Sequence, residues 1–251
     1  MTGDAAAPRS PQRRPWPKPP LTVFPTTLWD YPSQHYGDRE QGDKRYVGAT
    51  PSWVVWQLLS RYTRPGDAVL DPMCGSGTTL DVCADLDRAG VGFDLAPTRD
   101  DITRADARAL PIDDASIDFV FIDPPYSTHV EYSDDPACIG RLDALADGGR
   151  AYYDAMDAVF NEIDRVLKDR RYVALFVSDT FRKRRPPLPS FEPIGFELFS
   201  LLRRRFRPID IICVTRKNAK LKQGNRRAAA VRDNFFMRGF TYCFIMKKER
   251  D

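Results

Sequence analysis

Short apolar runs alternate with stretches of helical spacing along most of the chain, and several of the runs end at an aspartate. Short runs rich in β-branched residues indicate buried strands, whereas apolar residues three and four positions apart indicate helices. The runs that indicate strands cover residues 68–70, 90–93, 102–103, 117–122, 172–177, 209–214 and 240–246. The stretches that indicate helices cover residues 53–59, 80–86, 148–167 and 191–202.

The alternation of strands and helices predicts an α/β fold, because helices that connect parallel strands cover both faces of a sheet. We expect a mostly parallel sheet of seven strands. No helical pattern separates the last two runs, at residues 209–214 and 240–246, so the C-terminal strand is expected to pair antiparallel.

The first 28 residues differ in composition from the rest of the chain, since seven of them are proline and arginine recurs among them. Prolines at this density prevent a helix or an inner strand, so residues 1–28 are expected to form a disordered arm. Residues 29–251 are then a single domain. Within it, residues 45–180 hold the strand–helix core, and residues 181–251 are a basic part with the last strands.

The composition excludes several classes of protein. With 251 residues, 42% of them hydrophobic, the chain suits one sizeable domain. No apolar run approaches the roughly 18 residues of a membrane-spanning helix, and the N-terminus does not resemble a signal peptide. We therefore expect a cytoplasmic protein without membrane contact. Five cysteines without a CxxC pair, and two histidines, favour neither a disulfide framework nor a metal site.

The net charge of +3 conceals an uneven distribution. Residues 181–251 hold 19 Lys and Arg against 6 Asp and Glu, whereas residues 1–180 are acidic overall. A basic C-terminal third on an acidic body suggests a polyanionic partner that contacts one part of the molecule. On charge alone, a solvated and charge-rich surface is the alternative.

A glycine-rich segment, residues 71–79, directly follows the first strand of the regular region. In parallel α/β sheets ligands bind beyond the carboxyl ends of the strands, and glycines there let the backbone approach a ligand closely. This candidate ligand loop consists of Asp71, Pro72, Met73, Cys74, Gly75, Ser76, Gly77, Thr78 and Thr79. It lacks the lysine of a P-loop, and its spacing differs from the GxGxxG fingerprint of dinucleotide-binding proteins.

Two further aspartates end the next two strands. Asp94 is placed to accept hydrogen bonds from both hydroxyls of a ribose, and Asp106 to accept one from an adenine amino group. Each of them alone would suit a helix cap or a surface position. Together with Asp71, they put carboxylates on three consecutive strand ends, which favours a cofactor that contains adenosine.

The fourth strand ends in Asp123, Pro124, Pro125 and Tyr126. Two successive prolines fix their φ angles and remove two N–H donors, so the turn is stiff and presents its carbonyls outward. A carboxylate, a carbonyl and an aromatic ring then converge on one place, which suits a planar base with an exocyclic amine. The acceptors orient the amine so that its nitrogen presents a lone pair to an electrophilic methyl group. An ordinary Pro-Pro turn with a packed tyrosine is the alternative.

These motifs resemble those of the amino-methyltransferases that use S-adenosylmethionine and methylate exocyclic nitrogens in nucleic acid. DPMCGSGTT is similar to their cofactor loop, and DPPY is similar to their catalytic motif. Thr50 and Pro51 begin a stretch that resembles the helix before this loop in the DNA N4-cytosine and N6-adenine enzymes. The resemblance covers about residues 45–180 and implies a Rossmann-like methyltransferase fold.

The resemblance also implies roles for particular residues. Thr50, Pro51 and the loop would contact S-adenosylmethionine, Asp94 would hold its ribose, and Asp106 with the adjacent Ala107 would hold its adenine. By the same likeness, Asp123 and the Pro124 carbonyl would hold the target amine, and Tyr126 would stack on the base.

Two features leave the substrate open. The loop precedes the catalytic motif here, whereas most DNA enzymes with a GSGTT loop have the reverse order, and RNA guanine-N2 methyltransferases share the order of this chain. Against RNA, nothing before residue 45 resembles the THUMP RNA-binding module, and GSGTT with DPPYS is closer to the DNA enzymes. We therefore expect adenine N6 or cytosine N4 of DNA as the target. RNA guanine N2 is the alternative, and a catalytically silent nucleic-acid-binding module is the third hypothesis.

Basic clusters of the C-terminal third are candidates for contact with nucleic acid, because several follow strands at the edge where a target base enters. These candidates are Arg182, Lys183, Arg184, Arg185, Lys217, Lys220, Lys222, Arg226 and Arg227. His129, in the polar segment after the catalytic motif, is a further candidate, and a solvated surface is the alternative for all of them. Because little chain lies outside the core, we expect modest sequence specificity or a base that is already unpaired.

Overall fold

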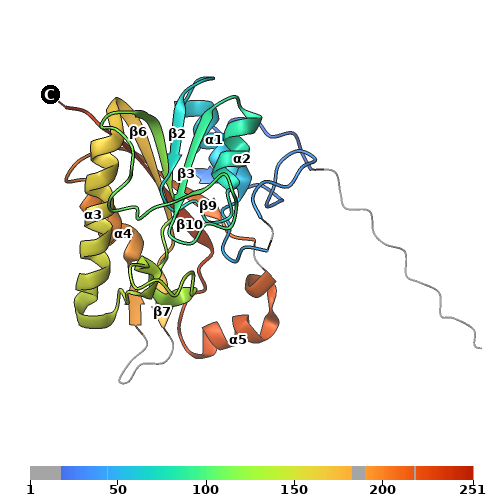
Figure 1. The fold of residues 1–251 in the computed structure, drawn as a ribbon. Helices are drawn as coiled ribbons and strands as arrows, with labels where there is room; N and C mark the ends of the chain where they lie inside the picture. The colour runs from blue at the N-terminus through green and yellow to red at the C-terminus, as the bar shows by residue number, and fades with distance from the viewer. Residues whose placement is uncertain (1–17, 44, 183–189, 218, 251) are drawn as a thin grey trace, which may run out of the picture.

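The computed structural model describes residues 18–43, 45–182, 190–217 and 219–250 (Figure 1). Its main sheet has eight strands in the order β1-β9-β10-β6-β5-β2-β3-β4. Neighbouring strands are parallel except at β10, which runs antiparallel to β6 and β9. The strands are β1 (Leu28–Trp29), β2 (Ala68–Asp71), β3 (Ala89–Asp94), β4 (Thr103–Arg104), β5 (Ile117–Ile122), β6 (Leu167–Val177), β9 (Arg207–Thr215) and β10 (Phe240–Lys247). A separate hairpin pairs β7 (Thr180–Arg182) with β8 (Ser190–Glu192).

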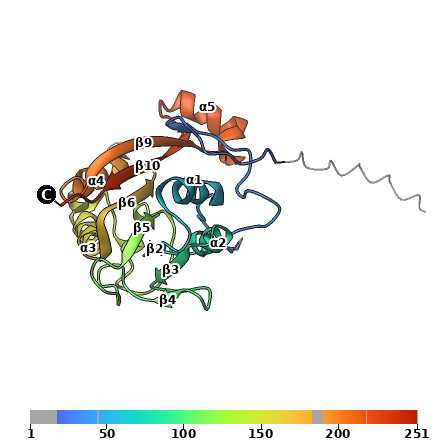
Figure 2. The ribbon, with the colours of Figure 1, turned by 90° about the horizontal axis from the view of Figure 1, so that it is seen from above.

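Helices cover both faces of the sheet, as the view from above in Figure 2 shows. One face carries α1 (Ser52–Tyr62) and α2 (Thr78–Asp85), and the other carries α3 (Arg150–Val166) and α4 (Ile194–Leu202). A fifth helix, α5 (Gly224–Arg232), lies apart from both faces and has no buried residue.

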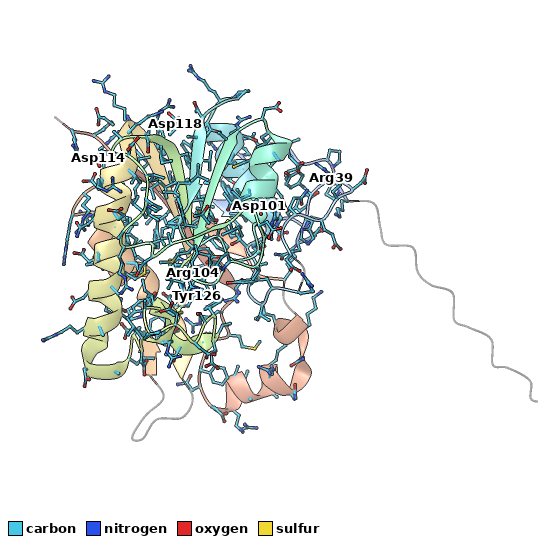
Figure 3. The ribbon with its side chains drawn as sticks, viewed as in Figure 1. Arg39, Asp101, Arg104, Asp114, Asp118 and Tyr126 are labelled. Carbon is cyan, nitrogen blue, oxygen red and sulfur yellow. The ribbon has the colours of Figure 1, made fainter. Side chains whose placement is uncertain are left out.

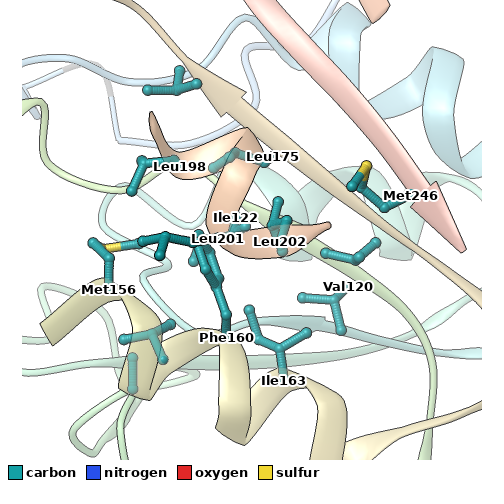
Figure 4. Packing of buried hydrophobic residues seen from close by; sticks show 14 of the residues in the cluster. Val120, Ile122, Met156, Phe160, Ile163, Leu175, Leu198, Leu201, Leu202 and Met246 are labelled. Carbon is teal, nitrogen blue, oxygen red and sulfur yellow. The ribbon is translucent and has the colours of Figure 1, made fainter. Parts of the chain in front are cut away.

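The central strand β5 shows why both faces need a helical layer. All six of its residues are buried, and successive side chains of a strand point to opposite faces. Phe119 and Phe121 belong to the core cluster on the α1 side. Val120 and Ile122 belong to the cluster on the α3 and α4 side, which Figure 4 shows from close by. A strand whose residues are all buried needs a covering layer on both of its faces.

The seven expected strands are present, and the antiparallel pairing of the C-terminal strand is confirmed. The eighth strand, β1, pairs with β9 through two residues and is too short to appear in the hydrophobic pattern. The helix expected over residues 191–202 begins only at Ile194, because Ser190–Glu192 is paired with β7. Among the described residues, no helix is long and apolar enough to cross a membrane.

The segment before β1 differs from the expected disordered arm of residues 1–28. From residue 18 the chain is described, and Gln57 of α1 holds it by accepting the N–H of Phe24 at 2.9 Å and donating to the carbonyl of Thr22 at 2.6 Å. Leu21 and Phe24 pack partly buried against the core. Two apolar side chains among the prolines therefore attach this part of the segment to the core, and residues 1–17 lie outside the described residues.

Candidate active site

The parallel strands β2, β5, β6 and β9 end at the same side of the sheet, here called the carboxyl edge, and the segments that follow them meet there. A cavity of about 720 Å³ lies at this edge. In Figure 3, Tyr126 lies toward this end of the molecule, whereas Asp118, near the start of β5, lies at the opposite end. The cavity therefore occupies the position where ligands bind in α/β sheets.

Most of the residues that the sequence analysis singled out for cofactor and catalysis line this cavity. They are Thr50, Pro51, Asp71, Pro72, Met73, Cys74, Gly75, Ser76, Thr78, Thr79, Asp94, Asp106, Ala107, Asp123, Pro125 and Tyr126. Gly77 and Pro124 belong to the same segments but are not among the lining residues.

The loop after β2 requires glycine at its tip. Gly75 has a φ of +46°, and a Cβ atom there would come within 2.8 Å of the ring of Tyr46. The N–H of Gly75 donates to Oδ2 of Asp94 at 2.9 Å, and the N–H of Ala96 donates to Oδ1 of Asp94 at 2.9 Å. Asp94 thus fixes the loop against the end of β3 and keeps one lone pair on each oxygen for a ligand.

Asp71 holds the base of the loop from inside. The hydroxyl of Thr79 donates to its Oδ2 at 2.5 Å, and the N–H of Met73 donates to its Oδ1 at 3.2 Å. Burial raises the pKa of Asp71 to about 7, although both hydrogen bonds oppose this change. Because its two oxygens accept bonds from the loop, Asp71 acts on a ligand mainly through the shape that it gives the loop.

Asp106 is held by a neighbouring arginine. Its carboxylate accepts the N–H of Arg108 at 3.0 Å, and the guanidinium of Arg108 binds it through Nε at 2.9 Å and Nη2 at 2.6 Å. Burial alone would raise the pKa of Asp106, but the bonds and charge of Arg108 outweigh burial and lower it. These bonds use most of the acceptor capacity of the carboxylate, so an adenine amine would share it with Arg108.

Asp123 lies between two hydroxyl groups. Oγ1 of Thr50 donates to its Oδ2 at 2.5 Å, and the hydroxyl of Tyr126 donates to its Oδ1 at 2.6 Å. Burial raises the pKa of Asp123 to about 6, while the two hydroxyl donors and the charge of Arg216 oppose the rise. Thr50 therefore does not cap α1, whose N-terminus has no side-chain cap, but binds the candidate catalytic carboxylate instead.

The Pro-Pro turn after Asp123 is fixed from the α3 layer. The hydroxyl of Tyr152 donates to the carbonyl of Pro125 at 2.8 Å, and the N–H of Ser127 donates to the same carbonyl at 3.1 Å. Ser127 adopts a φ of +61°, which turns the chain sharply after the motif. The carbonyl of Pro125 is therefore occupied by the protein itself.

The residues of the cavity wall that were not predicted as site residues include two tyrosines and an arginine. Tyr46 and Tyr132 stack with their ring centroids 6.0 Å apart, and they come from loops before α1 and after β5. Arg216 follows β9 directly and donates through Nη1 to Oγ of Ser178 at 3.1 Å. Applying the strand-end rule to β9 would have found Arg216, whereas nothing in the local pattern marks the two tyrosines.

The predicted nucleic-acid contacts are only partly brought together. His129 and Lys217 line the cavity, and Lys217 pairs with Asp30 at 2.8 Å. Lys220, Lys222, Arg226 and Arg227 belong to the segment of η4 (Ala219–Lys222) and α5, away from the lining. Arg182 ends β7, and Lys183, Arg184 and Arg185 lie outside the described residues.

Comparison with known proteins relates part of the chain to DNA methylases. Residues 6–104 match the model of the N6/N4 family described as DNA methylase. This match confirms the expected resemblance to the N6/N4 DNA methylases over these residues, which are less than half of the chain. Among its relatives are the type II methyltransferases M.HpaI of Haemophilus parainfluenzae, 32% identical over 71 residues, and M.Cfr9I of Citrobacter freundii, 44% identical over 52 residues.

The matches to these two relatives are partial. They cover 28% and 21% of this chain, and 22% and 17% of M.HpaI and M.Cfr9I, so the chain spans about a fifth of the length of these relatives. Among solved structures, TrmN from Thermus thermophilus aligns over 80% of this chain and 50% of its own, with a TM-score of 0.51 and 18% identity. This likeness concerns the fold alone, and together with the family match it confirms the expected methyltransferase fold.

Proposed function

We propose that this protein transfers a methyl group from S-adenosylmethionine to an exocyclic amine of a base in DNA, at adenine N6 or cytosine N4. The observation that carries the proposal is Asp123. Its carboxylate faces the same cavity as the glycine loop and is held by hydroxyl donors on both oxygens.

The donor set of the cavity fits S-adenosylmethionine. Asp94 offers carboxylate oxygens to ribose hydroxyls. Gly75 lines the cavity with its backbone alone, so a ligand can approach the loop closely there. Asp106 and Ala107 form the part of the wall that suits the adenine. When bound, this cofactor supplies an electrophilic methyl group on its sulfonium sulfur.

Asp123 performs the central step by orienting the amine. In its ionised form the carboxylate accepts an N–H of the target amine, and the Tyr126 hydroxyl gives up its bond to Oδ1 to make room. The amine nitrogen would then accept the methyl group that the bound cofactor supplies, and the nitrogen would lose one proton to Asp123 or to water. Positioning and electrostatics in a partly buried site supply the rate enhancement, without a covalent enzyme intermediate.

The basic residues of the C-terminal part would contact the phosphates of the substrate. Lys217 lines the cavity, and Lys222, Arg226 and Arg227 stand on the exposed segment that begins beside it. We infer that residues 45–180 form the catalytic core and that residues 181–251 contact the substrate. An unpaired base would reach the cavity without the free-energy cost of flipping out of a duplex.

The proposal is tested with a tritiated methyl donor and three substrates: duplex DNA, single-stranded DNA and total RNA. We expect incorporation into DNA, recovered as N6-methyladenine or N4-methylcytosine after digestion to nucleosides. N2-methylguanine from RNA would overturn the choice of DNA. Cofactor binding without incorporation into any substrate would overturn the assignment as an enzyme.

The pH dependence of the transfer rate tests the role of Thr50. Only ionised Asp123 accepts the amine, so the rate is expected to fall as the pH drops below about 6. Thr50→Val removes a donor that lowers the pKa of Asp123, so the acidic limb of the rate profile moves up by about one pH unit. Arg216 and Tyr126 also face Asp123 and are unchanged in this variant. Thr50→Ser keeps the hydroxyl, so the acidic limb of its rate profile should match that of the wild type. An acidic limb in Thr50→Val at the same pH as in the wild type would contradict this role of Thr50.

A further inference from the structure

A second cavity lies beside the candidate active site. It measures about 190 Å³ and is lined in part by Ser178, which follows β6, and by Gly239, which precedes β10. Arg216 stands between the two cavities. It lines the larger one, its N–H donates to the carbonyl of Gly239 at 2.9 Å, and its guanidinium donates to Ser178 at 3.1 Å. A ligand that extends from the large cavity past Arg216 would therefore meet the second one.

Aromatic rings form the rim of the second cavity. Phe236 is 83% exposed, Phe191 is 49% exposed and Phe240 is 41% exposed, and all three line it. Large aromatic side chains are rarely left in water, and a group of them around a cavity indicates a binding surface. Flat rings of this kind stack on nucleobases whatever the base, because every base has a π-face.

Polar groups stand among these rings. Arg238 places its guanidinium 5.1 Å from the ring centroid of Phe191 and donates through Nη2 to the carbonyl of Phe236 at 2.7 Å. Its Nε–H is buried and has no acceptor in the described part of the chain. Asp179, on the same wall, accepts the N–H of Gly195 at 3.0 Å through Oδ1. The site thus offers both a donor and an acceptor, as the edge of a nucleobase requires.

The segment that carries this cavity is strongly basic. Residues 216–239 contain eight Lys and Arg and one Asp, and α5 within them has no buried residue. In Figure 1, α5 lies below the carboxyl edge of the sheet. Residues at that edge line both cavities. A phosphate backbone that follows this segment would deliver its bases to the aromatic rim.

We propose that the second cavity binds the nucleobase next to the target base on the same strand, with Phe236 as its stacking surface. This proposal rests on the proposed function, because it places the target base in the large cavity. It accounts for three features at once: the exposed rings, the buried Nε–H of Arg238 and the position of Arg216 between the cavities. It also assigns a contact with the strand outside the methyl-transfer centre.

The test uses single-stranded DNA with 2-aminopurine beside the target base, on either side of it. The Phe236→Ala variant is expected to weaken binding of this DNA about 10-fold and to remove the fluorescence change of 2-aminopurine that stacking produces. Affinity for S-adenosylmethionine should stay unchanged. Val231→Ala is the matched control, since Val231 lies on α5, is 86% exposed and does not line the cavity.

The possible outcomes separate this proposal from the proposed function. If the wild type methylates the DNA but both variants bind it equally and keep the fluorescence change, the second cavity does not bind a base and the proposed function stands. If the wild type neither binds nor methylates DNA, both proposals are wrong. A loss of binding and of the fluorescence change in Phe236→Ala alone supports the second cavity.

Discussion

Replacing Asp123 with alanine is expected to lower the rate of methyl transfer by about 100- to 1,000-fold, as the loss of a preorganised electrostatic contact to the reacting group does elsewhere. In the proposed mechanism the carboxylate orients the target amine, and Thr50 and Tyr126 cannot replace it because both donate to it. Affinity for S-adenosylmethionine should change little, since the loop is held by Asp71 and Asp94. Single-turnover transfer rates and calorimetric titration of the cofactor measure the two effects separately.

The matched control for this variant is Asp113→Ala. Asp113 is an exposed aspartate in the loop before β5, and its loss should leave the transfer rate unchanged. Two results would contradict the role of Asp123: a transfer rate in Asp123→Ala close to that of the wild type, or a loss of cofactor affinity as large as the loss of rate. The second result would show that Asp123 contacts the cofactor rather than the target amine.

Replacing Asp94 with alanine is expected to weaken S-adenosylmethionine binding by about 10- to 100-fold, the range for losing a hydrogen bond to a charged group. Asp94 has two tasks in the proposed site. It fixes the loop through the N–H groups of Gly75 and Ala96, and its remaining lone pairs accept the ribose hydroxyls. At saturating cofactor the transfer rate should recover most of its wild-type value, because Asp123 is untouched. Equilibrium titration measures the affinity for the cofactor, and transfer rates at high cofactor concentration measure the rate at saturation.

Asp100→Ala provides the comparison for this second variant. Asp100 is exposed and lies six residues beyond Asp94 in the same connection, so its loss removes a charge nearby without touching the loop. Wild-type cofactor affinity in Asp94→Ala would rule out this carboxylate as the ribose acceptor. The thermal unfolding temperatures of both variants show whether the protein has also been destabilised, because Asp94 fixes the loop through two hydrogen bonds.

Local patterns predicted the parts of this protein that depend on neighbouring residues in the chain. The mostly apolar run of β5 requires cover on both faces. Asp71 and Asp94 are the last residues of β2 and β3, and Asp123 directly follows β5. Because parallel strands end at one edge, this order along the chain already implied that the three carboxylates lie near one another. The antiparallel pairing of the C-terminal strand was predicted correctly, but the premise that no helix precedes this strand was wrong. The helix α5 lies between β9 and β10, and it has no buried residue, so it left no apolar period in the sequence.

Contacts between distant segments decided the rest. Thr50 donates a hydrogen bond to Asp123, which lies 73 positions further along the chain, and Tyr46 stacks on Tyr132. The hydrophobic pattern of the sequence indicates neither contact. The two residues of β1 pair with the end of β9, and Arg216 comes to stand between two cavities only once β9, β10 and β6 are side by side. Sequence alone therefore determined the layers, the glycine-rich loop and the Pro-Pro turn, because these depend on hydrophobic spacing and local backbone chemistry. The tertiary structure alone decided which hydroxyls hold Asp123 and which rings enclose the cavities, because those contacts depend on how the loops pack.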